Sequence, residues 1–455
     1  MYIHFVGIGG IGMSGLAEIM LELGHKVSGS DIRETEITQK LRQKGACIYI
    51  GHRGKQIEGK DLVVFSSAIR SCNPEIKEAA KREIPLISRG ELIARITNLK
   101  ESIVIAGTHG KTTTTALVAE LLLNAKKDPT IFIGGILRRI NSNTRLGKSK
   151  LVIVESDESD ASFLLLRPSI AVITNVENDH LDFYHSPENI LQAFVKFGDK
   201  IKREGVGIVN FDDPALSYAF KKRKKVKKFL TYGLTSKADI WAKDISLGAL
   251  SSSFKVGYKK RLLGKVKVPL PGLYNVSNCL AMVGVGIVLG IKWEEIRKTF
   301  FFFQGVKRRL DKIGQIGKVP VFDDYAHHPT EIKAILRELK RLNKRIIAIF
   351  QPHRYTRTKF LLPDFLSAFN EADVLVLTPI YSAGELPIPG VNGRAFFEIL
   401  RKERKLPTYY FSSRKKIIEF IRDHLQDNDL IVTIGAGDIT RLSRQFIISL
   451  KEKQG

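Results

Sequence analysis

The stretch that decides the fold is IVIAGTHGKTTTT, which runs from Ile103 to Thr115. It is typical of a buried strand, then a turn with glycines, then a helix that opens at Lys111. Backbone N–H groups of such a turn, together with the helix N-terminus, bind phosphate oxygens. Lys111 would add positive charge at the β- and γ-phosphates, and the Thr112 hydroxyl would reach Mg²⁺. Position 105 is Ile where the common motif has Gly, yet the order of features predicts a nucleotide phosphate loop.

Short apolar runs alternate with amphipathic stretches on both sides of this loop. The runs are rich in Ile, Val and Leu, as are the buried strands of parallel sheets. We therefore predict an α/β protein of three domains: a Rossmann-like domain over residues 1–98, a central phosphate-loop domain over 99–303 and a Rossmann-like domain over 304–455. Residues 229–270 are predicted to form an antiparallel insert in the central domain. The predicted buried strands are IHFVGIG, LVVFSSA, SIVIAGT, LVIVESD, IAVITNV, VGIVNF, RIIAIFQP, VLVLTPI and LIVTIGAGD.

The chain of 455 residues carries a formal net charge of +26, which attracts polyanions. Its strongest basic run, KKRKKVKK at Lys221–Lys228, has no aromatic residues that would stack on bases. We expect this run to be a solvated lead-in to a strand, and we expect no dedicated nucleic-acid partner. Small substrates with several phosphates suit the charge equally well, and so does a general compositional bias toward lysine.

Other features of the composition favour the cytoplasm. No apolar run approaches the roughly 20 residues that a membrane-spanning helix needs, so no membrane insertion is expected. The first residues lack the basic and apolar regions of a secretory signal. Cys47, Cys72 and Cys279 match neither a zinc spacing nor a disulfide framework, which favours a reducing compartment.

A second glycine motif, HFVGIGGIGMSG, lies at His4–Gly15. Gly7, Gly9 and Gly12 have the spacing of a dinucleotide-binding turn. Asp31 closes the following strand, where dehydrogenases place the acid that binds a ribose, so this motif alone favours NAD. The turn itself requires only a diphosphate at a helix N-terminus and does not select the nucleotide.

A dense group of carboxylates follows the strand LVIVESD. Glu155, Asp157, Glu158 and Asp160 would repel one another unless a cation is present, and their oxygens suit Mg²⁺. Taken alone, the group is equally well an exposed acidic turn. His180 follows the next strand; a single histidine there is more often structural, but beside a phosphate loop it becomes a candidate ligand of a second Mg²⁺.

Polar residues also open the predicted helix in GLYNVSN. Asn275 and Asn278 lie one helical turn apart and share a face, so their amides would contact a nucleotide base or serve as ordinary loop contacts. Taken alone, Arg308 and Arg309, in GVKRRLD, are solvated surface arginines.

Two polar clusters lie in the third predicted domain. DDYAHHPTE, residues 323–331, is either a metal or acid–base site or a helix N-terminus with Pro near the first helical position. His353, Arg354 and Arg357, in FQPHRYTRT, are suited to hold a carboxylate.

The chain resembles the Mur ligases, which join an amino acid to a nucleotide-linked sugar acid at the expense of ATP. The resemblance implies ATP and Mg²⁺ as cofactors, UDP-N-acetylmuramate and L-alanine as substrates, and an acyl phosphate on the lactyl carboxylate, in peptidoglycan precursor synthesis. It also implies that the N-terminal glycine turn binds the UDP-sugar instead of NAD, and a monomer or homodimer is expected. The motifs that carry it, in order, are HFVGIGGIGMSGLAE, SRGELIAR, AGTHGKTTTT, ESDESDASFL, NVENDHLDFY, PGLYNVSNCLA, GVKRRLD, DDYAHHPTEI, FQPHRYTRT, IYSAGE and IGAGDI.

The resemblance assigns roles to the residues at matching positions. Some family members carry a carbamylated lysine at the metal; Lys196 is the nearest candidate by position and is not among the implied ligands. The implied catalytic residues are Lys111, Glu155 and His180, and the implied Mg²⁺ ligands are Thr112, Glu155 and His180. The implied ATP-binding residues are Gly107, Thr108, His109, Gly110, Lys111, Thr112, Thr113, Asn275, Asn278, Arg309 and Asp324. The implied UDP-sugar-binding residues are Gly7, Gly9, Gly10, Gly12, Ser14, Asp31, Ser88 and Arg89. The implied amino-acid-binding residues are His328, His353, Arg354 and Arg357, with His327 nearby.

Three alternatives are distinguished by experiment. A ligase of the same family that attaches a preformed tripeptide would accept that tripeptide, although its glycine turn departs from GIGGIGMSG. An NAD-dependent oxidoreductase with an ATP-regulated domain would bind reduced nicotinamide at the first domain. A nucleic-acid-binding ATPase would show hydrolysis that polynucleotides stimulate and that depends strongly on salt.

Overall fold

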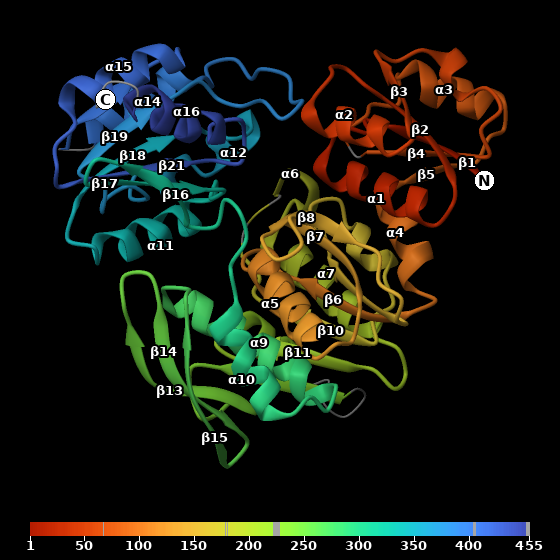
Figure 1. The fold of residues 1–455 in the computed structure, drawn as a ribbon, viewed down its shortest axis with the longest axis horizontal. Helices are drawn as coiled ribbons and strands as arrows, with labels where there is room; N and C mark the ends of the chain where they lie inside the picture. Colours follow the sequence, from red (N-terminus) through yellow and green to blue (C-terminus); the bar gives the residue numbers. More distant parts are fainter. Residues whose placement is uncertain (67, 178, 180, 222–227, 404–405, 452–455) are drawn as a thin grey trace. The chain divides into compact units, whose positions relative to one another are not determined.

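The computed structural model describes residues 1–66, 68–177, 179, 181–221, 228–403 and 406–451 (Figure 1). They form three α/β domains, each built around its own sheet, as the sequence predicts. The chain forms two compact units: Met1–Ile245, Phe254–Lys267 and Tyr274–Gln304 make the first, and Ser246–Ser253, Val268–Leu273 and Gly305–Gly455 the second. None of the helices in the described ranges is both long and apolar enough to span a bilayer.

The first sheet has five parallel strands in the order β3-β2-β1-β4-β5, which is the order of the first five strands of a Rossmann fold. Its strands are β1 (Tyr2–Val6), β2 (Lys26–Asp31), β3 (Cys47–Ile50), β4 (Leu62–Phe65) and β5 (Leu86–Ser88). Its helices are α1 (Ile11–Glu22), α2 (Glu36–Gln43), α3 (Pro74–Lys81) and α4 (Arg89–Thr97). The carboxyl ends of β1, β2 and β5 bring the glycine turn, Asp31 and Ser88 to one edge of the sheet.

The central sheet has ten strands in the order β15-β14-β13-β12-β11-β10-β6-β9-β7-β8. Its strands are β6 (Glu101–Ala106), β7 (Thr130–Leu137), β8 (Ser142–Arg145), β9 (Leu151–Glu155), β10 (Ile170–Ile173), β11 (Val206–Asn210), β12 (Lys228–Gly233), β13 (Ile240–Leu247), β14 (Ser252–Tyr258) and β15 (Arg261–Val268). Its helices are α5 (Lys111–Asn124), α6 (Leu181–Tyr184), α7 (Pro187–Asp199), α8 (Pro214–Lys221), α9 (Leu273–Val288) and α10 (Trp293–Phe302). Strands β10, β6 and β9 are parallel neighbours, so the phosphate loop after β6 lies between the polar ends of the other two.

The prediction of an antiparallel insert over residues 229–270 is wrong for β12 and for the start of β13. β12 pairs in parallel with β11 because α8 returns the chain between them. β13 then begins in parallel with the end of β12, with Tyr232 opposite Ile240. Only the links 248–251 and 259–260, drawn in green in Figure 1, are short enough to make antiparallel hairpins of β13, β14 and β15. The Lys221–Lys228 run lies almost wholly outside the described residues, which include only its two ends.

The third sheet has six strands in the order β16-β17-β21-β18-β19-β20. Its strands are β16 (Asp311–Ile316), β17 (Val319–Asp324), β18 (Arg345–Phe350), β19 (Val374–Leu377), β20 (Thr408–Tyr410) and β21 (Asp429–Ile434). Its helices are α11 (Pro329–Lys340), α12 (Tyr355–Phe360), α13 (Leu362–Phe365), α14 (Gly393–Glu403), α15 (Arg414–His424) and α16 (Thr440–Lys451). Neighbouring strands of this sheet pair in parallel except β16 and β17. Both clusters predicted for this domain therefore follow strands with parallel neighbours, β17 and β18.

A buried polar network supports the glycine turn of the first sheet. The Glu75 carboxylate, which has no exposed surface, accepts a 2.6 Å hydrogen bond from the Ser30 hydroxyl. It also lies 2.9 Å from Nδ1 of His52 and 3.3 Å from Nε2 of His4, and Nδ1 of His4 lies 2.9 Å from the Ser28 hydroxyl. Burial by itself raises the pKa of Glu75, but the hydrogen bonds from His4, Ser30 and His52 outweigh it, so the pKa is lowered.

We expect Glu75→Gln to lower the free energy of unfolding by about 1–3 kcal/mol at neutral pH, because it weakens hydrogen bonds to a buried charge. The folded-state pKa of Glu75 lies below its unfolded value of about 4.3, so this stabilisation is present above that value and is lost as the pH falls through the folded pKa. Urea unfolding of the unaltered chain and of Glu75→Gln, measured from neutral pH to below about pH 4, should show that their difference in free energy of unfolding shrinks in acid. Glu58→Gln, at an exposed ion pair with Arg82, is the control. A difference that does not change with pH would mean that the charge of Glu75 contributes nothing.

Candidate nucleotide and substrate sites

The phosphate loop joins β6 to α5 and needs glycine at two positions. Gly107 and Gly110 have φ angles of 139° and 81°, in the region that favours glycine. A Cβ atom on Gly107 would lie 1.9 Å from the Thr174 hydroxyl, and one on Gly110 would lie 2.5 Å from Oδ1 of Asn278. Gly110 is the N-cap of α5, so the helix opens at Lys111, as predicted.

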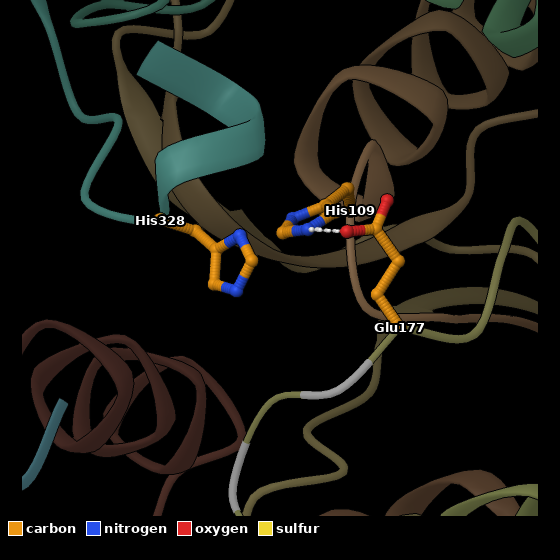
Figure 2. Close-up of side chains that lie close together, drawn as sticks. All are labelled: His109, Glu177 and His328. Carbon is orange, nitrogen blue, oxygen red and sulfur yellow. Dashed lines mark ion pairs between the residues drawn. The ribbon is translucent and has the colours of Figure 1, made fainter. Parts of the chain in front are cut away.

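The loop is fixed to the chain that follows β10. The backbone N–H groups of Thr108 and His109 donate to the backbone oxygen and side-chain Oδ1 of Asn175, at 3.0 and 2.8 Å. The Thr174 hydroxyl donates to the His109 carbonyl at 2.7 Å. Figure 2 shows the ion pair between Nε2 of His109 and Glu177, 3.4 Å long. The loop backbone is therefore held in shape by its neighbour, as a site that binds phosphate through backbone N–H groups requires.

Lys111 lies back over the loop. Its ammonium donates to the carbonyls of Gly107 and Thr108, at 2.6 and 3.1 Å, and to Oε1 of Glu158 at 2.7 Å. Burial lowers the pKa of Lys111, but the charges of Glu158, Asp157 and Glu155 outweigh it and raise the pKa. The pKa of Glu158 is raised to about 7, chiefly by burial, despite its contact with Lys111. Lys111 thus stays protonated beside the loop.

Two of the predicted magnesium ligands are in contact. The Thr112 hydroxyl donates to Oε1 of Glu155 at 2.7 Å, and the Gly134 N–H donates to Oε2 at 2.6 Å. A Cβ atom on Gly134 would lie 2.6 Å from Glu155, so glycine there lets the β7 backbone approach. A hydroxyl and a carboxylate at the opening of α5 are the oxygen ligands that Mg²⁺ prefers, so these residues fit that ion. The third predicted ligand, His180, lies outside the described residues.

Asn275 and Asn278, on α9, lie against the opening turn of α5 and are both buried. Oδ1 of Asn278 accepts a hydrogen bond from Thr114 at 3.2 Å, and its Nδ2 donates to Asn275 at 3.2 Å. The structure therefore brings both to the phosphate loop. Their contact with ATP stays a prediction, and so does that of Thr113, which lies half-buried in the first turn of α5.

The glycine turn of the first domain is closed by β2. The Ser30 carbonyl accepts from the N–H groups of Gly7 and Ile8, at 2.8 and 3.0 Å. The Asp31 carboxylate accepts from the Gly9 N–H at 2.9 Å. Gly10 is the N-cap of α1, and the buried Ser14 hydroxyl donates back to the Ile11 carbonyl at 3.0 Å. The turn has the form that binds a diphosphate, with Asp31 beside it. The roles of Asp31 and Ser14 toward a UDP-sugar stay predictions.

Ser88 and Arg89 begin α4 with a capping box. The Ser88 hydroxyl accepts from the Glu91 N–H at 3.2 Å, and Glu91 accepts from the Ser88 N–H at 2.6 Å. Arg89 extends over Gly12, where a Cβ atom would lie 2.7 Å from Nη1. Its Nη2 lies 3.3 Å from the Asp157 carboxylate of the central domain.

The carboxylates after β9 do not form one cluster, because each has a different neighbour. Asp157 pairs with Arg89 and accepts from the Ser159 N–H at 3.0 Å; Asp160 accepts from the Ser162 N–H at 2.9 Å. Burial raises the pKa of Asp157, but the charge of Arg89 and the hydrogen bond from Ser159 outweigh it, so the pKa is lowered. The sequence left open an acidic turn or a cation site. The structure has an ordered turn, and the cation site at Glu155, which contacts Thr112, stays a prediction.

In the third domain, the helix-capping interpretation of DDYAHHPTE is confirmed, because His328 is the N-cap of α11 and Pro329 its first residue. Asp324 is buried and accepts from the N–H groups of Leu310 and Ala326, at 2.5 and 2.7 Å. Burial raises its pKa to about 7, although the charge of Arg309 opposes this. Arg309 lies over the Tyr325 ring, 5.5 Å from its centroid.

The second cluster of this domain brings a histidine and two arginines together after β18. Nδ1 of His353 lies 3.2 Å from Nη1 of Arg357, and the His353 ring stacks on Tyr381. Burial, with the charges of His327, Arg357 and Arg354, lowers the pKa of His353 to about 2, so it is neutral. Arg354 has a φ of 70° and pairs with Glu385 at 3.9 Å. The cluster is suited to hold a carboxylate.

Some residues of these sites were not predicted individually. Tyr381 and Glu385 follow β19 in IYSAGE, and their position after a strand was the signal that could have identified them. Gly134 gave no signal, because its contact with Glu155 joins strands that pair only in the folded sheet.

Comparison with known proteins gives a family for each domain. Family models match residues 2–101 (Mur ligase family, catalytic domain), 105–286 (Mur ligase middle domain) and 308–437 (Mur ligase, glutamate ligase domain). A relative from Geotalea daltonii, named UDP-N-acetylmuramate–L-alanine ligase, is 46% identical over 99% of this chain and 98% of its own. One of the same name from Aquifex aeolicus is 44% identical over 98% and 96%.

A crystal structure of UDP-N-acetylmuramate-alanine ligase from Thermotoga maritima matches 100% of both chains, with a TM-score of 0.84 and 31% identity. A murein peptide ligase from Psychrobacter arcticus shares the fold, with a TM-score of 0.74 and 24% identity over 99% of this chain and 98% of its own. The resemblance drawn from the motifs is therefore confirmed, and the chain belongs to the Mur ligase family.

Proposed function

We propose that this chain is an ATP-dependent ligase that joins L-alanine to the lactyl carboxylate of UDP-N-acetylmuramate and releases ADP and phosphate. The observation that carries the proposal is the match, over nearly the whole chain, to relatives of that name at 44–46% identity. The phosphate loop and the glycine turn supply the two nucleotide sites that this reaction needs.

The chemistry explains why a phosphate loop serves a ligase. A carboxylate is a poor electrophile, because its leaving group would be oxide. Transfer of the γ-phosphoryl group from ATP gives an acyl phosphate and ADP. The alanine amine then attacks the acyl carbon, the C–O bond to phosphate breaks, and the amine loses its proton as the amide forms. Both nucleophile and phosphoryl group are anionic in the first step, so positive charge must be supplied along the transfer path.

Lys111 is the cation that this chain provides. It opens α5 and now binds loop carbonyls and Glu158, so it needs only to turn toward an incoming phosphate. The loop N–H groups that do not donate to Asn175, together with the α5 N-terminus, would bind the other phosphate oxygens. Thr112 and Glu155 would hold Mg²⁺, which supplies charge neutralisation at the phosphates when bound. By family resemblance His180 is a further ligand.

The amino acid would bind in the third domain. Arg354 and Arg357 are suited to the alanine carboxylate, and neutral His353 can accept a hydrogen bond there. With a pKa of about 2, His353 does not serve as the base that deprotonates the alanine ammonium. Arg309 and Asp324 are proposed ATP contacts, and His328 is a proposed amino-acid contact.

The test is phosphate release by the purified chain with Mg-ATP, UDP-N-acetylmuramate and L-alanine, with each component omitted in turn. We expect release to need all three, with the amide product identified by mass. Release that depends on a tripeptide instead of alanine would identify the tripeptide-attaching enzyme of the family. No release with either acceptor, from folded protein, would contradict the proposal.

A further inference from the structure

Arg89 is a charged side chain that contacts both nucleotide-binding regions of the first unit. It is the first residue of α4, and the capping box of Ser88 and Glu91 fixes where that helix begins. Its guanidinium lies against Gly12 in the first turn of α1, where even a Cβ atom would come within 2.7 Å of Nη1. Arg89 therefore occupies space that glycine leaves open at the helix N-terminus predicted to bind the diphosphate.

The other end of the same guanidinium group is held by the central domain. Nη2 lies 3.3 Å from Oδ2 of Asp157, while Oδ1 of Asp157 accepts from the Ser159 N–H at 3.0 Å. One carboxylate oxygen is thus anchored to its own turn and the other faces Arg89. The pair is half-buried, with 25% of the Arg89 side chain and 44% of the Asp157 side chain exposed.

The domains that carry the two residues are also joined beside this pair. Nδ2 of Asn143 donates to the Ile11 carbonyl at 2.8 Å, and a Cβ atom on Gly15 would lie 2.3 Å from Thr144. The first turns of α1 therefore pack directly on β8. Asp157 can act on Arg89 across a junction that is already closed.

We propose that Asp157 is a positioning residue for the UDP-sugar: it holds Nη2 of Arg89 so that Nη1 faces the glycine turn. The proposal rests on the proposed function, since it takes the diphosphate of UDP-N-acetylmuramate as the ligand of that turn. An arginine has several rotatable bonds, and a carboxylate that fixes its free edge lowers the entropy lost when the other edge binds an anion. A residue of the ATP-binding domain thereby contributes to the affinity for the other substrate.

Isothermal titration calorimetry of the full chain with UDP-N-acetylmuramate, which measures the Kd, tests this proposal. Asp157→Ala should raise the Kd about two- to five-fold, the range expected of a half-exposed ion pair. Asp157→Asn keeps an oxygen that accepts from Arg89 and should restore part of the loss. In an Arg89→Gln background, Asp157→Ala should have little further effect, because its action passes through Arg89.

Two further variants separate positioning from general damage. Gly12 lies in α1, and Gly12→Ala adds only a methyl group, directed at Nη1 of Arg89. This variant should also raise the Kd for the UDP-sugar. Asp160→Ala removes a turn hydrogen bond like that of Asp157, the one from the Ser162 N–H, and should leave this Kd unchanged.

Each contrary result has its own meaning. An unchanged Kd in Asp157→Ala, or equal losses with and without Arg89, would overturn the proposal. Tighter binding would also overturn it, because Asp157 would then compete with the diphosphate for Arg89. If the unaltered chain did not bind UDP-N-acetylmuramate at all, the proposed function itself would be contradicted.

Discussion

Lys111→Ala is expected to lower the rate of phosphate release at least about a thousand-fold, because it removes the cation that neutralises the transferring phosphoryl group. The UDP-sugar should still bind, since its proposed site is the glycine turn after β1. Steady-state phosphate release and titration with UDP-N-acetylmuramate measure the two effects separately. Loss of both would mean that the ATP and UDP-sugar sites are not independent.

The fold is expected to survive this substitution. Removal of Lys111 leaves Glu158 buried without its cation, which costs several kcal/mol when a carboxylate stays charged. The pKa of Glu158 is already about 7, so it can take up a proton near neutral pH instead. The double variant Lys111→Met with Glu158→Gln removes the buried charge and should be equally inactive. Lys255→Ala, at the exposed Lys255–Asp244 ion pair, is the control that should keep full activity.

Local sequence was sufficient to predict the parts of the site that lie within one strand-turn-helix unit. IVIAGTHGKTTTT gives the strand, both glycine positions and the start of α5, because all of them depend on contacts between near neighbours. The same holds for Gly7, Gly9 and Asp31, since a glycine turn after one strand meets the end of the next in any Rossmann half.

Contacts between distant segments could not be predicted in this way. Arg89 and Asp157 lie 68 positions apart, and nothing in SRGELIAR or ESDESDASF selects one as the partner of the other. The acidic turn illustrates the same limit: four carboxylates between Glu155 and Asp160 predict a cation site or an exposed acidic turn, whereas the fold separates them by giving each a different neighbour. The alternating pattern of the later strands, β14 and β15, extends the predicted antiparallel insert back over β12, whereas α8 returns the chain so that β12 pairs in parallel with β11.

Glu155→Gln should lower the rate of phosphate release by about a hundred-fold or more, since a metal ion at the phosphates contributes several kcal/mol to the transition state. The side chain keeps its size, and an amide oxygen can still accept from the Gly134 N–H while the Thr112 hydroxyl turns to accept from the amide. The substitution therefore removes charge with little change of shape. Glu120→Gln, at a buried glutamate of α5 that pairs with Arg139, is the control and should remain active.

The dependence on magnesium separates two roles that Glu155 could have. If it holds Mg²⁺, the concentration of Mg²⁺ for half-maximal rate should rise in Glu155→Gln, and excess Mg²⁺ should restore part of the activity. If it only joins β7 to the opening of α5, through Gly134 and Thr112, the rate should fall with the Mg²⁺ dependence unchanged. The second pattern would contradict the proposed metal site while leaving the phosphate loop intact, because Lys111 and the loop N–H groups act without Glu155.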